Sequence, residues 1–284
     1  MPSIKAHAKI NIGLRILGRR RSDGYHLIET IFQELDFADT IIIDINTSGF
    51  FTLTCNREDI SVTEDNLILK AINALKPSLP KMLGAEIHLE KNIPPGSGLG
   101  GGSSDAAAIL KFFSAYCQIP VDLKTVATVL GADVSFFLRG GTAYATGIGE
   151  DLETITIPLN WTVVLVIPNF QISTQQAYCD LRIPLTDTIK KPKILSFLQG
   201  KFAWQFFEND FERVIIPAYP QIGKIKSALL KAGADFSALS GSGSTVYGIF
   251  SSNDAAKSCI PLVQEFGRVV ICHPYPLANN SGVV

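Results

Sequence analysis

The stretch Pro94–Asp105 reads PPGSGLGGGSSD, and five of the seven residues from Gly96 to Gly102 are glycine. Glycine permits positive φ angles and lets backbone amides approach a ligand without a Cβ in the way. The two serines and the aspartate at its end are expected to open a helix, Ser103–Tyr116, whose unpaired N-terminal amides attract anions. With a strand predicted at Ala85–Glu90, this arrangement of strand, glycine loop and helix predicts a cradle for a polyphosphate.

Three other interpretations of the glycines are weaker. A P-loop requires a lysine directly before the serine, where Gly102 stands. The dinucleotide pattern GxGxxG can be laid over Gly96, Gly98 and Gly101, but no acidic residue follows at the distance expected for a ribose contact. A flexible surface loop is disfavoured by the Pro-Pro pair before the glycines and the alanine-rich segment after them.

Pro94–Ala106 resembles the second motif of the GHMP kinase superfamily. Leu130–Val134 (LGADV) is similar to the segment in which this superfamily keeps an aspartate, and Ser240–Ser244 (SGSGS) is similar to its C-terminal motif. The motifs occur in the superfamily's order. The resemblance implies an ATP-dependent kinase of a small hydroxylated metabolite. The chain departs from the superfamily pattern at two positions. It has Ser135 where proline is frequent, and Asp105 where asparagine is also common.

The resemblance implies an α+β, two-domain GHMP kinase fold with the active site in the cleft between the domains. We expect an N-terminal ATP-binding domain over residues 1–155 and a C-terminal domain over 156–284, divided near Pro158. The second half supports a ferredoxin-like domain by its own pattern. That pattern predicts strand Trp161–Ile167, helix Ile222–Ala232, strand Thr245–Phe250, helix Asp254–Glu265 and strand Arg268–Cys272.

Alternation, helical spacing and turn residues predict the remaining elements. No regular structure is expected from Pro276 to Val284. The predicted strands are Ile4–Ile16, His26–Leu35, Thr40–Ile45, Phe51–Cys55 and Ala143–Ala145. The predicted helices are Glu64–Leu75, Leu123–Leu130, Gln175–Asp180, Ile194–Leu198 and Asn209–Val214.

The resemblance assigns catalysis to Lys9 and Asp133. Phosphoryl transfer needs alignment, charge neutralisation and a group that takes the hydroxyl proton. A carboxylate at Asp133 can accept that proton, and a cation at Lys9 would lie near it and the γ-phosphate and stabilise negative charge. Two plainer interpretations stay open: Asp133 caps a helix starting at Val134, or Lys9 is an exposed strand lysine.

The stretch Ala8–Thr30, which contains AKIN and DGYH, resembles the superfamily members that phosphorylate the 2-hydroxyl of a cytidyl-diphospho-methylerythritol in the non-mevalonate isoprenoid route. The resemblance implies that Tyr25 and Tyr178 stack on the cytosine ring and His26 hydrogen-bonds its edge. Core packing is the alternative for both tyrosines. A kinase of homoserine or a mevalonate derivative, or a non-catalytic relative, is the alternative for the chain. The other substrate-binding residues implied are Asn11, Thr174, Gly241, Ser242 and Gly243.

ATP binding is assigned by the resemblance to the glycine stretch, with two further residues near adenine and ribose. Mg²⁺ is expected to accompany ATP, because the triphosphate charge must be offset. No carboxylate can be assigned as its ligand, and the hydroxyls of the two serines are candidates. The residues assigned to ATP are Pro94, Pro95, Gly96, Ser97, Gly98, Leu99, Gly100, Gly101, Gly102, Ser103, Ser104, Asn66 and Lys91.

The amino-acid composition limits which partners the protein can bind and which cellular compartment it suits. With 25 basic and 26 acidic residues the net charge is −1, so no overall basic field attracts nucleic acid or anionic lipid. The basic cluster Arg19–Arg21 is either a solvated turn or a contact for an anionic substrate. Five widely spaced cysteines predict neither disulfides nor zinc. The start of the chain lacks the apolar run of a signal peptide, and no membrane span is expected. These features favour a cytoplasmic small-molecule enzyme, a monomer or weak homodimer.

Overall fold

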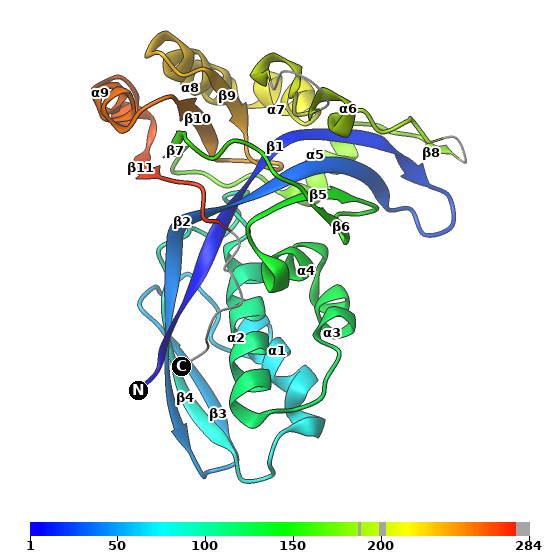
Figure 1. Ribbon diagram of the computed structural model, residues 1–284, viewed down its shortest axis with the longest axis vertical. Helices are drawn as coiled ribbons and strands as arrows, with labels where there is room; N and C mark the ends of the chain where they lie inside the picture. The colour runs from blue at the N-terminus through cyan, green and yellow to red at the C-terminus, as the bar shows by residue number, and fades with distance from the viewer. Residues whose placement is uncertain (187–188, 199–202, 277–284) are drawn as a thin grey trace. The chain divides into compact units, whose positions relative to one another are not determined.

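The computed structural model describes residues 1–186, 189–198 and 203–276 (Figure 1). The chain forms two compact units that are each discontinuous in sequence. Unit 1 comprises Met1–Ala8, Phe37–Pro95 and Gly100–Arg139, and unit 2 comprises Lys9–Asp36, Gly96–Leu99 and Gly140–Val284. Two long strands, β1 (Ser3–Arg20) and β2 (His26–Asn46), contribute residues to both units. The domain division at 155/156 stays a prediction.

Unit 1 is built from strands covered by helices. Strand β4 (Gly84–Glu90) pairs in parallel with β3 (Phe51–Cys55) and antiparallel with the second half of β2, from Thr40↔Glu90 to Asn46↔Gly84. In Figure 1 the helices of this unit lie on one side of these strands. They are α1 (Leu67–Leu75), the short 3₁₀ helix η1 (Lys76–Ser78), α2 (Gly101–Cys117), α3 (Leu123–Leu130) and α4 (Ala132–Arg139).

The core of unit 1 follows helical spacing. Helix α1 buries Ile68, Ala71, Ile72 and Leu75, which recur every three or four residues and so lie on one face. Helix α2 is alanine-rich and buries Ala106 to Leu110 in succession, because small side chains let neighbouring elements approach it from several directions. The helix that follows the glycine stretch is therefore fixed from several sides.

Unit 2 contains a four-stranded antiparallel sheet with the order β11-β7-β10-β9. Its strands are β7 (Thr162–Ile167), β9 (Phe236–Leu239), β10 (Val246–Phe250) and β11 (Arg268–Cys272). Helix α8 (Pro220–Lys231) lies between β7 and β9 in the chain, and α9 (Asn253–Val263) between β10 and β11. This βαββαβ order with these neighbours is the ferredoxin-like arrangement, which confirms the prediction. All six residues of β7 are buried, as its apolar sequence requires.

The remainder of unit 2 surrounds the hairpin of β1 and β2. Strand β2 pairs with β5 (Thr142–Thr146), which pairs with β6 (Asp151–Thr154), and β1 pairs in parallel with β8 (Leu185–Thr186). Gly24 closes the hairpin with φ +77°, as its Asp-Gly turn signal predicts. The other elements are α5 (Thr174–Asp180), α6 (Ile194–Leu198), η2 (Trp204–Phe206), α7 (Glu212–Ala218) and η3 (Gln264–Phe266).

Several predicted boundaries were wrong, and local chemistry explains one of them, the start of α1. Strand β2 is continuous, where two strands were expected. Helix α1 begins at Leu67, three residues late, because the side chain of Asn66 caps it by accepting from the Ile68 amide. Strands β6, β8 and β9 were not predicted; two of them are only four residues long and one only two. Residues 277–284, where no regular structure was expected, lie outside the described residues.

Hydropathy along the described helices identifies none with the length and apolar character that crossing a bilayer requires.

Candidate active site

The glycine loop, Gly96–Gly102, has the backbone that its composition predicts. Gly96, Gly98 and Gly100 have φ angles of +63°, +80° and +73°, which other residues rarely adopt. Helix α2 begins at Gly101 with Gly100 as its N-cap, and no side chain caps it. The expected start at Ser103 was therefore wrong: the two serines lie in the first turn, and Asp105 is turned into the interior of unit 1.

The tip of the glycine loop, Gly96–Leu99, is held by hydrogen bonds within unit 2. The Leu99 carbonyl accepts from the Lys9 amide at 3.0 Å, and the Ser97 carbonyl accepts from the Thr245 amide at 3.1 Å. The Gly98 carbonyl accepts from Ser240 Oγ at 2.9 Å. A Cβ on Gly98 would lie 2.1 Å from the Ser240 carbonyl oxygen. The tip thus lies directly against β1 and against residues 240–244, the C-terminal glycine loop.

Lys9 points its ammonium into a buried polar network. Its Nζ donates to Asn11 Oδ1 at 2.7 Å and lies 5.1 Å from the centre of the Phe32 ring. Asn11 Nδ2 donates to Thr30 Oγ1 at 3.0 Å, and that hydroxyl donates to the Gly13 carbonyl at 2.5 Å. Lys9 is only 4% exposed, so its interpretation as an exposed strand lysine was wrong. The network fixes where the Lys9 charge lies relative to the loop tip.

Asn209, which the sequence analysis did not identify, positions the C-terminal glycine loop. Its Nδ2 donates to the carbonyls of Leu239 and Gly241, both at 2.8 Å, and its Oδ1 accepts from the Phe211 amide. A Cβ on Gly241 would lie 3.5 Å from Asn11 Oδ1. An asparagine between Glu208 and Asp210 carries no sequence signal for this role, because the carbonyls that it holds come from a segment thirty residues away.

The first turn of α5 is joined to the same loop. Thr174 Oγ1 and Ser242 Oγ lie 2.7 Å apart in a hydrogen bond. Thr174 and Tyr178 are four residues apart on α5, so they lie on one side of it. The structure therefore brings together the predicted residues Asn11, Thr174, Ser242 and the loop tip in unit 2.

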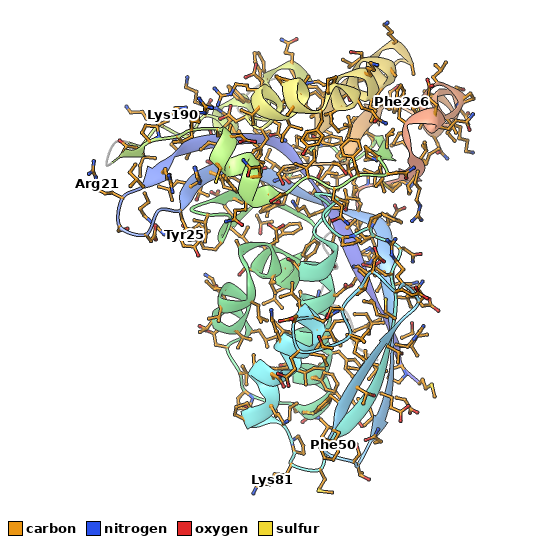
Figure 2. All side chains as sticks on the ribbon, turned by 180° about the vertical axis from the view of Figure 1, so that it is seen from behind. Arg21, Tyr25, Phe50, Lys81, Lys190 and Phe266 are labelled. Carbon is orange, nitrogen blue, oxygen red and sulfur yellow. The ribbon has the colours of Figure 1, made fainter. Side chains whose placement is uncertain are left out.

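Tyr25 and His26 differ sharply in exposure. Tyr25 stands at the end of the hairpin and the residue is 57% exposed, so its interpretation as a core residue was wrong (Figure 2). The His26 ring stacks on Tyr178, with centroids 4.6 Å apart, and Tyr178 also meets the edge of Phe211. His26 Nε2 is buried without a hydrogen-bond partner. Burial and then the charge of Arg19 lower the pKa of His26, so its ring is neutral at pH 7.

Two members of the basic cluster stabilise the turn beneath Tyr25. Arg19 Nε donates to the Gly24 carbonyl at 3.0 Å, and Arg20 Nε donates to Asp23 Oδ1 at the same distance. Asp23 Oδ1 also accepts from the Tyr25 amide at 3.1 Å. These contacts agree with the turn interpretation for Arg19 and Arg20.

The predicted ATP residues Asn66 and Lys91 have other contacts in unit 1. Asn66 caps α1, and its Nδ2 donates to the Ser61 carbonyl at 2.7 Å. Lys91, 6% exposed, pairs with Asp39 and, at 2.7 Å, with Asp105. Contact of either residue with ATP stays a prediction. The sequence around Lys91 gives no indication that Asp39 and Asp105, which are distant from it in the chain, will pair with its ammonium group.

The triad of Lys91, Asp39 and Asp105 joins three parts of unit 1. Asp39 Oδ1 also accepts from the amides of Asn92 and Ile93, at 2.6 and 2.8 Å, so the residues before the glycine loop are tied to β2. Asp105 Oδ1 is buried without a partner. Burial raises the pKa of Asp105 to about 7, against the opposing charge of Lys91.

Asp105→Asn is expected to remove a pH dependence of stability. In the unfolded chain the carboxyl ionises near 3.8, whereas in the folded protein it ionises near 7, so stability falls as pH rises between these values. Asparagine keeps an oxygen for Lys91 and has no charge to bury. From pH 5 to pH 8 the wild type should lose about 2–3 kcal/mol relative to the variant. Denaturant unfolding at both pH values measures this, with the exposed Asp122→Asn as control; parallel pH profiles for wild type and Asp105→Asn contradict it.

Asp133 lies in the first turn of α4, which begins at Ala132. An N-cap residue precedes the first helical residue, whereas Asp133 follows Ala132, the first residue of α4. The interpretation of Asp133 as the cap of a helix starting at Val134 was therefore wrong. The amide of Val134 donates instead to the Gly131 carbonyl at 3.0 Å. A carboxylate in the first turn is stabilised by the unpaired amides of the helix start. Asp133 is half-buried, and its catalytic role stays a prediction.

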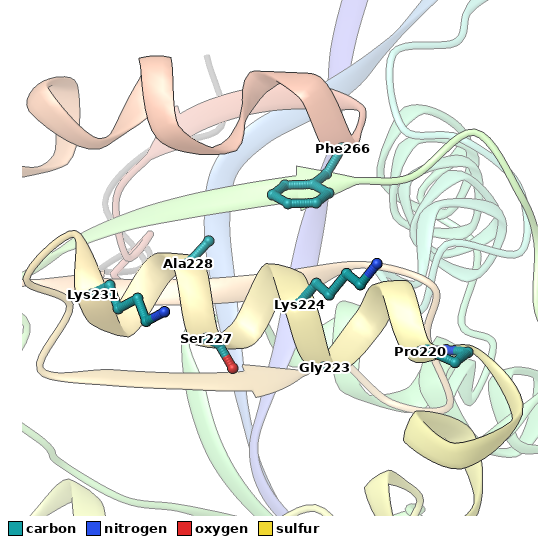
Figure 3. A pocket seen from close by; sticks show the side chains of 7 residues that line it. All are labelled: Pro220, Gly223, Lys224, Ser227, Ala228, Lys231 and Phe266. Atoms are coloured by element: carbon teal, nitrogen blue, oxygen red, sulfur yellow. The ribbon is translucent and has the colours of Figure 1, made fainter.

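Two further features of the described residues bear on where a ligand could bind. No cluster of three or more His, Cys, Asp and Glu side chains in the described part of the chain is placed to hold a metal ion. A surface hollow of about 540 Å³ lies beside α8, and no predicted site residue lines it (Figure 3). Its lining residues are Pro220, Gly223, Lys224, Ser227, Ala228, Lys231 and Phe266.

The predicted site residues fall in both units. Unit 2 holds the loop tip, the catalytic candidate Lys9 and all the substrate candidates, most of them joined by the contacts above. Unit 1 holds the start of α2 and the catalytic candidate Asp133. The other predicted residues of unit 1 are Pro94, Pro95, Asn66 and Lys91.

Comparison with known proteins agrees with this geometry. Residues 66–141 match the GHMP kinases N terminal domain, and residues 197–268 match the GHMP kinases C terminal domain. A 4-diphosphocytidyl-2-C-methyl-D-erythritol kinase of Chlorobaculum tepidum is 41% identical over 93% of this chain and 94% of its own. The kinase of that name from Pelodictyon phaeoclathratiforme is 38% identical over 95% and 96%.

A solved structure extends the likeness to three dimensions. The crystal structure of a 4-(cytidine 5'-diphospho)-2C-methyl-D-erythritol kinase superimposes with a TM-score of 0.79 at 31% identity, covering 95% of this chain and 98% of that one. The likeness spans both units and all the motifs described above. The chain therefore belongs to the 4-diphosphocytidyl-2-C-methyl-D-erythritol kinase family of GHMP kinases.

Proposed function

We propose that this protein transfers the γ-phosphoryl group of ATP to the 2-hydroxyl of 4-diphosphocytidyl-2-C-methyl-D-erythritol, a step of isoprenoid synthesis that does not pass through mevalonate. The observation that carries the proposal is the position of Lys9. Its backbone binds the tip of the glycine loop, and its ammonium is held by Asn11, beside the C-terminal glycine loop. A phosphate loop, a fixed cation and a polar acceptor-side residue are what a phosphotransferase needs.

The glycine loop and the start of α2 hold the triphosphate in this proposal. Amides of the loop and of the first turn of α2 face the anion without Cβ atoms in the way. Mg²⁺ bound with ATP offsets part of the triphosphate charge, and the half-buried hydroxyl of Ser103 is the first candidate to contact it. The tip is held in place because Lys9, Ser240 and Thr245 donate hydrogen bonds to its backbone carbonyls.

Asp133 and Lys9 carry the chemical step. Asp133 accepts the proton of the substrate 2-hydroxyl as its oxygen attacks the γ-phosphorus, and the bond to ADP breaks. Lys9 stabilises negative charge on the transferring group. Asn11 keeps the Lys9 ammonium in one orientation, which limits the reorganisation needed in the transition state.

Cytosine recognition rests on the contrast between Tyr25 and His26. Tyr25 offers an open aromatic face, and His26 offers a buried nitrogen without a partner. A flat ring with polar edges satisfies both, by stacking on the first and hydrogen bonding to the second. Tyr178, stacked on His26, holds that imidazole in place and closes the other side of the base.

Tyr25→Ala is expected to raise KM for the cytidylyl substrate about 10–100-fold, since one base-stacking contact contributes about 1–3 kcal/mol. KM for ATP should change less than about twofold, and Tyr25→Phe should stay near wild type because it keeps the aromatic face. Steady-state kinetics with each substrate varied in turn measures both constants. The exposed Tyr116→Ala in α2 is the matched control. Equal increases in the two KM values rule out stacking on cytosine.

A kinase of homoserine or of a mevalonate derivative is the second candidate. Such acceptors have no flat ring, and they leave the exposed Tyr25 and the unpartnered His26 nitrogen without a use. A non-catalytic relative would be expected to lack Lys9 or Asp133, and this chain has both.

A further inference from the structure

Glu29 is a buried carboxylate on β2 to which neither the proposed chemistry nor the sequence motifs assign a role. Its residue exposure is 0%, in a strand whose neighbours Ile28 and Ile31 are apolar. A charge removed from water in this way is costly unless several donors surround it. The contacts of Glu29 therefore indicate what it does.

Four groups from three parts of unit 2 donate to the Glu29 carboxylate. Arg15 Nη1 on β1 forms an ion pair with Oε1, and the Tyr144 hydroxyl on β5 donates to Oε2 at 3.2 Å. The amide of Lys193 donates to both oxygens, at 2.9 and 2.8 Å, and the amide of Ile194 donates to Oε2 at 3.0 Å. The carboxylate thus receives the first amides of α6.

The segment that Glu29 holds runs along the hairpin that carries Tyr25 and His26. Residues Leu185 and Thr186 pair with Arg19 and Arg20, and the Lys190 amide donates to the Leu17 carbonyl at 2.8 Å. Figure 1 shows α6 beside β1. Segment 185–198, as far as the structure describes it, is thus bonded to β1 through Leu185, Thr186 and Lys190, and Glu29 bonds it to β2.

Gly13 lets segment 185–198 approach the buried hydrogen-bond network of Lys9, Asn11 and Thr30. Gly13 has φ +67°, and a Cβ there would lie 3.4 Å from Ile194 Cδ1 and 3.2 Å from Phe207 Cδ1. The Gly13 carbonyl accepts from Thr30, whose hydroxyl accepts from Asn11. Successive side chains of a strand point to opposite faces, so Glu29 lies behind the face that carries Thr30 and His26.

We propose that Glu29 is a positioning residue for the acceptor substrate. By binding the start of α6 behind the hairpin, it fixes β1 and β2 relative to each other where Asn11, Thr30 and His26 face the acceptor. The inference rests on the proposed function, since it assigns Glu29 to the cytidylyl side of the site and not to ATP. Loss of its charge in Glu29→Gln removes the ion pair with Arg15 and replaces one of the two acceptor oxygens with an NH₂ donor that faces the amides of α6, and the hairpin shifts.

The test compares Glu29→Gln with wild type in three measurements. KM for the cytidylyl substrate should rise about tenfold, with KM for ATP within about twofold, because a small displacement of positioning groups is costly for the substrate that they hold. Hydrogen exchange at the amides of Lys193 and Ile194 should accelerate. Glu29→Asp, which keeps the charge, should restore part of the acceptor KM.

The matched control is Glu34→Gln on the same strand. Glu34 is also buried and also accepts a backbone amide, that of Gly141 at 2.7 Å, so its loss should affect stability without separating the two KM values. If Glu29→Gln accelerates hydrogen exchange but raises both KM values equally, or raises neither, Glu29 is only structural and the inference fails.

Should Glu29→Gln not fold, Tyr144→Phe removes one donor to the Glu29 carboxylate and should raise the acceptor KM about two- to threefold. A wild type that does not use the cytidylyl substrate contradicts the proposed function instead.

Discussion

Asp133→Asn and Lys9→Met are each expected to lower kcat by about 10²–10⁴-fold while leaving the protein folded, the range typical for loss of one proton-transfer group. Asparagine has the shape of aspartate and cannot accept the hydroxyl proton. Methionine fills the space of the Lys9 stem and supplies no positive charge to the transferring phosphoryl group. Single-turnover kinetics with saturating ATP and acceptor measures the chemical step directly.

Controls and a double variant make this result specific. Asp122→Asn changes a carboxylate at the start of α3, and Lys5→Met changes a lysine on the same strand as Lys9; both should retain near-normal turnover. The double variant should be no slower than about the slower single variant, since groups that act on one step are not additive. Near-normal kcat in either Asp133→Asn or Lys9→Met would remove that residue from the mechanism.

Gly98→Ala is expected to have the second large effect. Gly98 has φ +80°, which costs an alanine about 1–2 kcal/mol, and its new Cβ would lie 2.1 Å from the Ser240 carbonyl oxygen and 2.9 Å from that of Gly243. These are backbone atoms, so the glycine loop or residues 240–244 must move. We expect kcat/KM for ATP to fall about 100-fold, since displacements of about 1 Å can cost that much.

Gly233→Ala separates the cost of a positive φ angle from the clash of the new Cβ with backbone oxygens, the two causes of the effect expected for Gly98→Ala. Gly233 has φ +94°, and a Cβ there meets nothing within 4 Å, so alanine carries the conformational cost without the clash. It should lose about 1–2 kcal/mol of unfolding free energy and keep its activity. Thermal unfolding and ATP titration of both variants provide the comparison. Normal ATP kinetics in Gly98→Ala would mean that the contact between the two glycine loops has no role in the reaction.

The motifs that carry the chemistry were predictable because each depends on local backbone chemistry. The glycines of Gly96–Gly102 could be assigned to a phosphate loop because positive φ angles and close backbone approach leave few other residue choices. The ferredoxin-like class of the second half could be inferred from its apolar strands and helices, although β9, one strand of that sheet, was not predicted. The catalytic candidates needed more: Lys9 and Asp133 were assigned by resemblance to the superfamily, not by their own sequence context.

What escaped prediction depends on contacts between distant residues. Helix α2 starts before its serines, and Asp105 pairs with Lys91 in the interior instead of marking the helix start. Lys91 also pairs with Asp39, and a carboxylate 66 positions before Asp105 in the chain gives no local signal. Glu29 lies in a largely apolar strand, whereas Asn209 stands between Glu208 and Asp210, and the partners of both lie on other elements. The rarity of a buried carboxylate in such a strand is a signal that could have found Glu29, because the carboxylate needs a set of donors to satisfy it; Asn209 has no such signal.

The most direct test of the proposed function is an acceptor comparison with purified wild-type protein, ATP and Mg²⁺. Formation of ADP is followed with 4-diphosphocytidyl-2-C-methyl-D-erythritol, mevalonate or homoserine as acceptor, and phosphorus NMR locates the new phosphate. We expect kcat/KM for the cytidylyl compound to exceed the others by at least about 10³-fold, with the phosphate on the 2-hydroxyl, as a site that must satisfy both an aromatic face and a buried nitrogen discriminates strongly. ADP formation with mevalonate or homoserine, and not with the cytidylyl compound, would contradict it.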